Sequence, residues 1–257
     1  MAATAEKSAT TVAPGVTHFV VERPRMSARR LAEYMVASPV RQRTLVRDTK
    51  YRTVEPEISY AEGFEILGEM IADGELSTDT LKDAADDFYD RMDVRGARER
   101  IRLDLIGDLF EWLGDHRPDF DLPDDAERYD TSRTWGRGGG FGLGGVEIDP
   151  EVHLRLRRVR RNVHLGLVTL RYSKSGPLDV DVALWQSSLL HGYLAATLED
   201  DGARAAPDLC LTLDLRTGAA HAAPGDARTR VRHMEAACAS IAERWPAVAP
   251  PPKAVLA

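Results

Sequence analysis

Five arginine side chains between residues 155 and 161 form the most basic run in the chain. They are Arg155, Arg157, Arg158, Arg160 and Arg161. Guanidinium groups spaced in this way can contact successive phosphates of a nucleic-acid backbone. Arginines on a β-hairpin also keep an exposed sheet face or edge soluble without any ligand. Both interpretations, nucleic-acid binding and a solvated sheet edge, stay open from the sequence.

Two further segments contain residue types that bind phosphate or metal in other proteins. Residues 140–145 read GFGLGG and match the letters of a dinucleotide-binding loop. They precede a predicted strand, however, so the helix N-terminus that holds a pyrophosphate is missing. The carboxylates from Asp115 to Asp125 lack the central glycine and terminal glutamate of a calcium-binding EF-hand. We interpret both segments as loops, and no histidine or cysteine spacing indicates a structural zinc site.

The net charge of −7 conceals three segments of alternating sign. Residues 19–53 contain nine Lys/Arg against three Asp/Glu, a net of +6. Residues 54–130 contain eight against 24, a net of −16, and residues 131–175 contain nine against three, a net of +6. The basic segments would attract nucleic acid and the acidic segment would repel it. Alternatively, the helices and the sheet simply have differently charged solvent-exposed faces.

Composition favours a globular protein of a reducing compartment. The 257 residues are 43% hydrophobic and 29% charged, which suits a folded domain without covalent cross-links. Cys210 and Cys238 lie among apolar residues, so we expect buried free thiols and a cytoplasmic location. No apolar stretch approaches the ~20 residues of a membrane helix, and no membrane partner is expected. Residues 1–18 and 247–257 are expected to be loose tails.

Helical spacing dominates residues 19–113. Ser27 is placed to cap one short helix, and Pro39 stands at the first position of a second helix. Ser59-Tyr60-Ala61-Glu62 fits a capping box at the start of a third helix. Apolar residues at helical spacing predict two more helices, over about 81–92 and 94–113.

The pattern changes in the second half of the chain. Residues 114–145 are acidic and then glycine-rich, and they predict a loop. Apolar and polar residues alternate over 152–157, and together with residues 163–172 they predict a two-stranded hairpin whose first strand begins near Val146. The elements predicted after it are a helix over 179–198, strands over 209–215 and 219–222, and a helix over 227–245. The sequence therefore predicts an α+β fold: a helical N-terminal part plus a small mixed β-sheet flanked by helices, over residues 146–246.

The order of these elements carries a resemblance to a known family. A helix, a two-stranded hairpin, a second helix and a further strand follow one another from residue 94 to residue 215. This order resembles the core of the PD-(D/E)XK nuclease superfamily, especially its RecB-like branch. In that family, acids from the first helix and both hairpin strands hold Mg²⁺, a lysine orients or deprotonates the attacking water, and a glutamine supports the site.

The resemblance assigns roles to particular residues of this sequence. In Asp149-Pro150-Glu151, Glu151 would be the metal carboxylate, and Gln186 would be the supporting glutamine. The (D/E)-x-K position falls on Leu167-Val168-Thr169, which offers neither an acid nor a lysine. Arg171 and Lys174 are candidates for a migrated cation. Candidates for the acid on the first helix are Asp104, Asp108 and Glu111.

Two functions from different classes follow. The resemblance and the basic segments favour a nuclease-fold protein of bacterial DNA metabolism or phage defence that binds nucleic acid, with Mg²⁺ or no cofactor, and has lost catalysis. The strongly acidic middle and the incomplete catalytic set favour a non-catalytic protein–protein interaction or assembly module. A small-molecule enzyme using the glycine-rich loop is a third alternative, but no pair of nucleophile and base can be identified.

Overall fold

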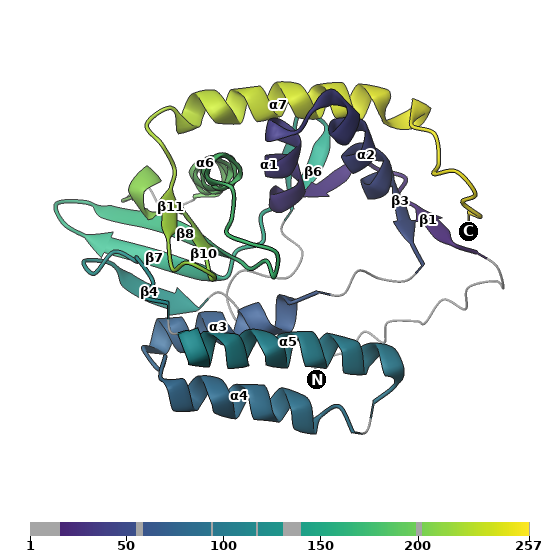
Figure 1. The fold of residues 1–257 in the computed structure, drawn as a ribbon. Helices are drawn as coiled ribbons and strands as arrows, with labels where there is room; N and C mark the ends of the chain where they lie inside the picture. The colour runs from purple at the N-terminus through teal and green to yellow at the C-terminus, as the bar shows by residue number, and fades with distance from the viewer. Residues whose placement is uncertain are drawn as a thin grey trace, which may run out of the picture.

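The computed structural model describes residues 16–54, 59–93, 95–116, 118–130, 140–198 and 202–256. Within these residues it combines α-helices with small mixed sheets, which confirms the predicted α+β fold. The main sheet lies between two groups of helices, one on each of its faces (Figure 1). Residues 1–15 of the expected N-terminal tail and 131–139 of the expected loop lie outside the described residues.

The main sheet is mixed, with strand order β11-β10-β8-β7-β4 and with β9 paired to the first half of β8. Its strands are β4 (Glu127–Asp130), β7 (Leu154–Val159), β8 (Val163–Arg171), β9 (Ala203–Ala205), β10 (Leu211–Asp214) and β11 (Ala220–Ala222). β7 and β8 form the predicted hairpin, in which Leu154 lies opposite Val168. β10 runs parallel to β8 and β11 returns antiparallel to β10. The hairpin pairing, the third strand and the return strand are therefore confirmed, but the first strand of the hairpin begins at Leu154 and not near Val146.

Two smaller sheets tie the N-terminal residues to the rest of the chain. β2 (Arg25–Ser27) pairs in parallel with β6 (Val146–Asp149), and β5 (Phe141–Leu143) pairs antiparallel with β6. β1 (His18–Val20) pairs antiparallel with β3 (Tyr51–Thr53). His18 also bridges to Leu256, so the last described residues lie against β1 instead of forming the expected loose tail.

Helices α1 and α2 begin where the capping serine and the proline in the sequence predicted. The helices are α1 (Ala28–Val36), α2 (Pro39–Lys50), α3 (Ala61–Asp73), α4 (Thr78–Asp90), α5 (Ala97–His116), α6 (Val180–Thr197) and α7 (Ala227–Arg244), with short 3-10 turns η1 (Pro207–Leu209) and η2 (Trp245–Ala247). The Ser27 hydroxyl accepts a hydrogen bond from the Arg30 N–H at 3.3 Å, as expected for a cap. Pro39 occupies the start of α2, where its missing N–H costs nothing.

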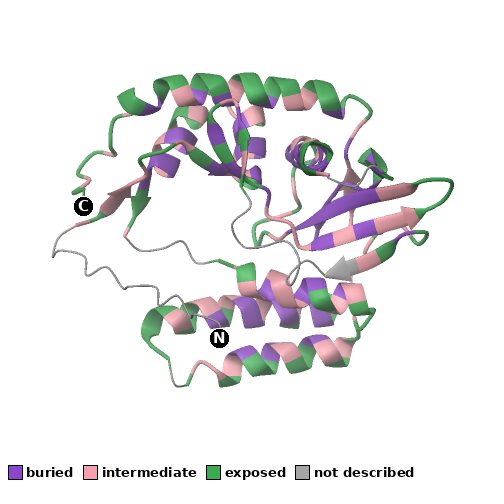
Figure 2. Ribbon diagram, turned by 180° about the vertical axis from the view of Figure 1, so that it is seen from behind, coloured by how far each residue is buried: buried purple, intermediate pink, exposed green. Residues whose placement is uncertain are grey.

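β8 is buried along most of its length (Figure 2). Its side chains enter two hydrophobic clusters, one on each face of the sheet. Val168 and Leu170 join the core that α3, α4 and α5 form with the sheet. Leu165 and Leu167 point the other way, into a cluster with Leu190 of α6. The helices expected as one N-terminal part therefore lie on both sides of the sheet, because α1 packs with α6 and α7 while α3 to α5 cover the opposite face.

The capping box predicted at residues 59–62 is wrong. α3 begins at Ala61, its cap residue Tyr60 makes no side-chain cap bond, and the Ser59 hydroxyl accepts only the Ala61 N–H. Glu62 does not reach back to the helix start because two arginines bind its carboxylate. A capping box does occur one helix later, between Ser77 and Thr80 of α4.

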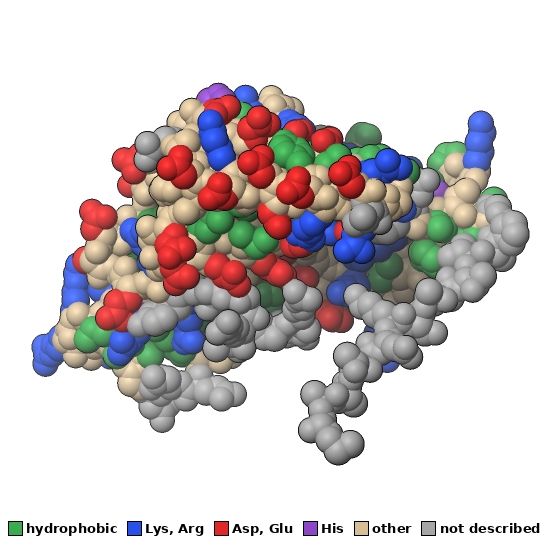
Figure 3. Space-filling view, turned by 90° about the horizontal axis from the view of Figure 1, so that it is seen from below, with side chains coloured by type: hydrophobic (Ala, Val, Ile, Leu, Met, Phe, Trp, Pro, Cys, Tyr) green, Lys and Arg blue, Asp and Glu red, His purple; other side chains and the backbone are tan. Residues whose placement is uncertain are grey.

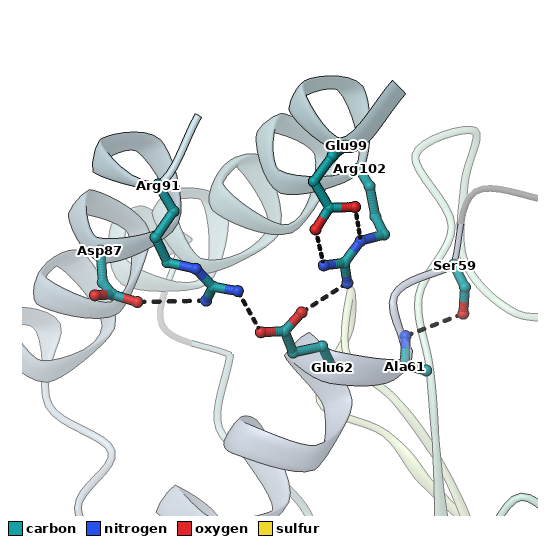
Figure 4. A network of polar contacts seen from close by, with 7 residues as sticks. All are labelled: Ser59, Ala61, Glu62, Asp87, Arg91, Glu99 and Arg102. Atoms are coloured by element: carbon teal, nitrogen blue, oxygen red, sulfur yellow. Dashed lines mark hydrogen bonds and ion pairs between the residues drawn. The ribbon is translucent and has the colours of Figure 1, made fainter. Parts of the chain in front are cut away.

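Glu62 links three helices. Its carboxylate contacts Arg91, just after α4, and Arg102 of α5, both at 2.6 Å (Figure 4). Partial burial acts to raise the pKa of the Glu62 carboxyl, but the hydrogen bonds from the two guanidinium groups outweigh it and lower the pKa below 4.5. A lowered pKa means that ionised Glu62 stabilises the folded state above pH 4.5 and loses this effect as the pH falls through the folded-state pKa.

Glu62→Gln is therefore expected to lower the free energy of unfolding by about 1 kcal/mol at neutral pH, a modest value because the carboxylate is about one-third exposed. The difference from the native chain should vanish at low pH, in urea unfolding curves recorded at both pH values. Asp83→Asn, at an exposed position of α4, is the matched control and should change stability little at either pH. An equal loss at both pH values would contradict the ion-pair account.

The two cysteines behave as the sequence predicted. Both are free and buried, and burial raises the pKa of each thiol to about 12. Neither is therefore a reactive thiolate at neutral pH. Among the described helices, none has the length and apolar character that crossing a membrane requires.

Candidate functional site

Glu151 lies in the link between β6 and β7, at the start of α1. Its carboxylate accepts a hydrogen bond from the Arg29 N–H at 3.2 Å, and its own N–H donates to Asp149 at 3.1 Å. The backbone there has a positive φ of 52°, which is uncommon outside glycine. A carboxylate at a free N–H of a helix start satisfies that donor and interacts favourably with the helix dipole. Glu151 therefore helps to cap α1.

Arg171, at the end of β8, connects three elements of the fold. Its guanidinium donates to the Gln186 side chain of α6 at 2.7 Å and to the Glu33 carboxylate of α1 at 3.2 Å. Gln186 in turn donates to the Thr169 hydroxyl at 3.4 Å. Gln186 and Thr169 are buried, and only 12% of the Arg171 side chain is exposed. The sheet, α6 and α1 are thus held together by one polar cluster, which we call the Arg171 cluster: Arg29, Glu33, Glu151, Thr169, Arg171 and Gln186.

Burial and neighbouring charges raise the pKa of Glu151 and lower the pKa of Arg171. Burial raises the pKa of the Glu151 carboxyl, and Asp149 adds to the rise, while the Arg29 N–H and Arg171 act against it. Burial and the charge of Arg29 lower the pKa of Arg171, and Glu33 and Glu151 oppose this. An arginine nonetheless keeps its proton in proteins. Arg171 is therefore a fixed cation and cannot accept a proton from water.

The Arg171 cluster does not fit the Mg²⁺ that the resemblance implies. Magnesium takes its ligands from oxygen atoms, usually one or two carboxylates together with water and phosphate. In this cluster the cationic side chain of Arg171 lies close enough to influence the charge of Glu151, so a metal ion at Glu151 would face a positive charge. Within the described ranges, no three His, Cys, Asp or Glu side chains group together in a way that could hold a metal ion.

The remaining predicted catalytic residues lie across the sheet from the Arg171 cluster. Asp104, Asp108 and Glu111 belong to α5, which packs on the face opposite α6. Asp108 pairs with Lys174 at 2.6 Å and also accepts from the Tyr89 hydroxyl, which donates to Glu111 at 3.0 Å. Asp104 is exposed. The structure therefore brings together Glu151, Arg171 and Gln186, and it does not bring Asp104, Glu111 or Lys174 to them.

Most of the hairpin arginines contact carboxylates of the same chain. Arg157 pairs with Glu127 across the strands at 3.0 Å. Arg158 pairs with Asp125 at 2.7 Å and with Asp208 at 2.5 Å, and Arg160 also pairs with Asp125, at 2.6 Å. Arg155 is half-buried and lies opposite Leu167 in the sheet, and Arg161 is exposed at the turn. The acidic loop predicted between residues 115 and 125 thus supplies part of the counter-charge for the basic run.

Comparison of the chain with protein-family models, with curated proteins and with solved structures gives no match.

Sequence reasoning missed two members of the Arg171 cluster, Glu33 and Arg29. Both lie on α1, more than a hundred residues before β8, and their contacts depend on how α1 docks against α6. The only available signal was their spacing: Arg29 and Glu33 are four residues apart and form an ion pair on α1. That spacing indicates a helix surface pair and does not point to β8.

Proposed function

We propose that this chain is a non-catalytic binding protein whose partner is another protein. The observation that carries the proposal is the state of Arg171, a permanent cation held by Gln186 and Glu33. It lies two residues after Thr169, which stands where a nuclease of the resembled family would have its lysine. A group that cannot release or accept a proton near neutral pH cannot serve as a general base. Binding without cleavage is therefore favoured.

Charge on the surface supports a protein partner over nucleic acid. The side of the molecule formed by α4 and α5 has Asp and Glu side chains gathered across it (Figure 3). The exposed acids of α4 alone are Asp79, Asp83, Asp86, Asp87 and Asp90. Such a surface repels a phosphate backbone. On the hairpin, Arg157, Arg158 and Arg160 already have carboxylate partners, so binding phosphate there would first require these pairs to be broken.

Nucleic-acid binding is the second candidate, and the helices α1 and α2 favour it. Arg29, Arg41 and Arg43 are exposed on this pair, and Arg47 is partly exposed. A surface of this kind would bind nucleic acid weakly and with strong dependence on salt.

The test is affinity capture of the full-length chain from its native host, with and without nuclease treatment. We expect a protein to be retained in fixed stoichiometry after the nucleic acid has been removed. The purified chain should leave plasmid and single-stranded DNA uncut in the presence of Mg²⁺ or Mn²⁺. Loss of the partner on nuclease treatment would favour the second candidate. Metal-dependent cleavage that Glu151→Ala abolishes would overturn the proposal altogether.

A further inference from the structure

A preformed groove lies between α2, the end of α7 and the residues that follow α7. Its cavity volume is about 690 Å³, and its walls include Val40, Arg43 and Arg47 of α2, Ile241 and Arg244 of α7, and Val248. Val40 is 68% exposed, so it offers an accessible apolar surface on this wall. The groove is distinct from the Arg171 cluster, with which it shares no wall residue.

Buried hydrogen bonds hold the far wall of the groove in place. The Lys50 ammonium, only 7% exposed at the end of α2, donates to the carbonyl oxygen atoms of Trp245, Pro246 and Val248, at 2.7, 3.3 and 3.3 Å. The Tyr51 hydroxyl donates to the same Val248 oxygen at 2.8 Å. A cation at the C-terminal end of a helix is electrostatically favourable. A ligand would therefore meet a wall that is already ordered, which lowers the entropic cost of binding.

The charged side chains that line the groove are all positive. Arg43, Arg47 and Arg244 line it, and none of its wall residues is acidic. Arg43 donates to the Pro39 carbonyl oxygen, and Arg244 donates to the Ser240 carbonyl oxygen and the Tyr34 hydroxyl, so these contacts leave their charge uncompensated. Arg47 lies 3.4 Å from Asp48. The groove thus combines an apolar surface with a positive rim.

The spacing of the arginines favours a ligand with several negative charges. Val40, Arg43 and Arg47 recur at helical spacing on one face of α2, and the two arginines stand about 6 Å apart along the helix axis. A fatty carboxylate carries one charge at one end and would engage one arginine. A helix with carboxylates four residues apart would present charges at the matching distance, and its apolar stripe would cover Val40 and Val248.

We propose that this groove docks an amphipathic helix of a partner protein, with Asp or Glu side chains four residues apart beside its apolar stripe. Because the occupant is a protein, this docking site rests on the function proposed above. A second copy of this chain is a poorer fit. Its acidic helix α4 buries Leu81, Ala85 and Phe88 in the core and has no apolar stripe left to offer.

The experiment uses the full-length chain and three fluorescent designed helices of about 18 residues, all with the same leucine stripe. Their polar faces carry Glu, Gln or Lys at the positions four residues apart. At about 0.1 M salt, fluorescence anisotropy should show the Glu helix binding at least about tenfold more tightly than the Gln helix, and the Lys helix not binding.

Two variants of α2 make a matched pair. Arg43→Glu reverses a charge in the groove and is expected to weaken binding of the Glu helix by at least about tenfold. Arg41→Glu makes the same change two residues away, at an exposed position outside the groove wall, and should weaken binding by about threefold or less. Circular dichroism melting of both variants shows whether each still folds. Val40→Asp is a further variant of the groove wall and is also expected to weaken binding of the Glu helix.

Several results would overturn the docking site. Equal effects of Arg41→Glu and Arg43→Glu would mean unspecific charge attraction. Saturable binding of dodecanoate in the absence of helix binding would assign the groove to a small amphiphile. Self-association in sedimentation runs that Val40→Asp abolishes would assign it to a second copy. If no helix binds but the host protein is still captured after nuclease treatment, the groove inference fails alone and the proposed function stands.

Discussion

Gly166→Ala is expected to destabilise the fold by about 3 kcal/mol or more, a large effect for the addition of one methyl group. Gly166 lies in the middle of β8, opposite Leu156 of β7. A Cβ atom at this position would overlap the backbone carbonyl and the Cβ of Leu209, in the turn η1. These atoms cannot rotate away as the end of a long side chain can, so β8 or η1 would have to move.

Urea unfolding followed by far-UV circular dichroism measures this effect. Gly142→Ala is the matched control, because Gly142 is also in a strand and a Cβ there would meet no atom within 4 Å. The control should stay within about 0.5 kcal/mol of the native chain. A Gly166→Ala protein of native stability would mean that β8 and η1 are not packed as described. The Arg171 cluster depends on the same strand, so its position would be in doubt as well.

Elements with strong local signals could be predicted from the sequence. Ser27 and Pro39 mark helix starts through side-chain capping and a fixed φ, which act within one turn and need no tertiary contact. The alternation over residues 152–157 predicted a strand because Leu154 and Leu156 of β7 pack in the core while the residues between them do not. Signals of this kind are local in cause and therefore visible in sequence.

Short strands paired over long distances could not be predicted. β2 pairs with β6 across some 120 residues, and each has only three or four residues, too few to show a period. We expected the hairpin's first strand to begin near Val146, but residues 146–149 pair with β2 and β5 instead of β8. Pro150 and the positive φ of Glu151 end β6 there, and the partner of β8 starts afresh at Leu154.

Part of the candidate site could also be predicted from the sequence, and part could not. The resemblance allowed three of its residues to be named from the sequence. These are Glu151 at the start of the hairpin, Arg171 on its second strand and Gln186 on the helix that follows. Glu33 could not be named, since its role arises only when α1 docks on α6. The hairpin arginines were interpreted from their own segment alone, whereas their carboxylate partners come from Asp125, Glu127 and Asp208. Charge counted along a chain does not reveal which charges are neutralised in the fold.

Arg171→Met is expected to lower the free energy of unfolding by about 2–3 kcal/mol. Methionine keeps the apolar stem but removes the guanidinium, which leaves the buried Gln186 carbonyl without its donor. It also leaves Glu33 with Arg29 as its remaining ion-pair partner. Arg171→Lys should recover only part of the loss, because one ammonium group cannot reproduce the planar fork that serves two acceptors. Lys174→Met removes a cation from an exposed pair with Asp108 and should cost about 0.5 kcal/mol or less.

A double-mutant cycle of Arg171→Met with Glu33→Gln separates the two contacts, by urea unfolding of the four proteins at neutral pH. We expect a coupling energy of about 0.5–1.5 kcal/mol between the two side chains, with the rest of the Arg171 effect coming from Gln186. If Arg171→Met were as stable as the native chain, Arg171 would not tie α1 and α6 to the sheet. Arg171 would then be free to bind a ligand. A cation that has no structural role at this position would favour nucleic-acid binding over a protein partner.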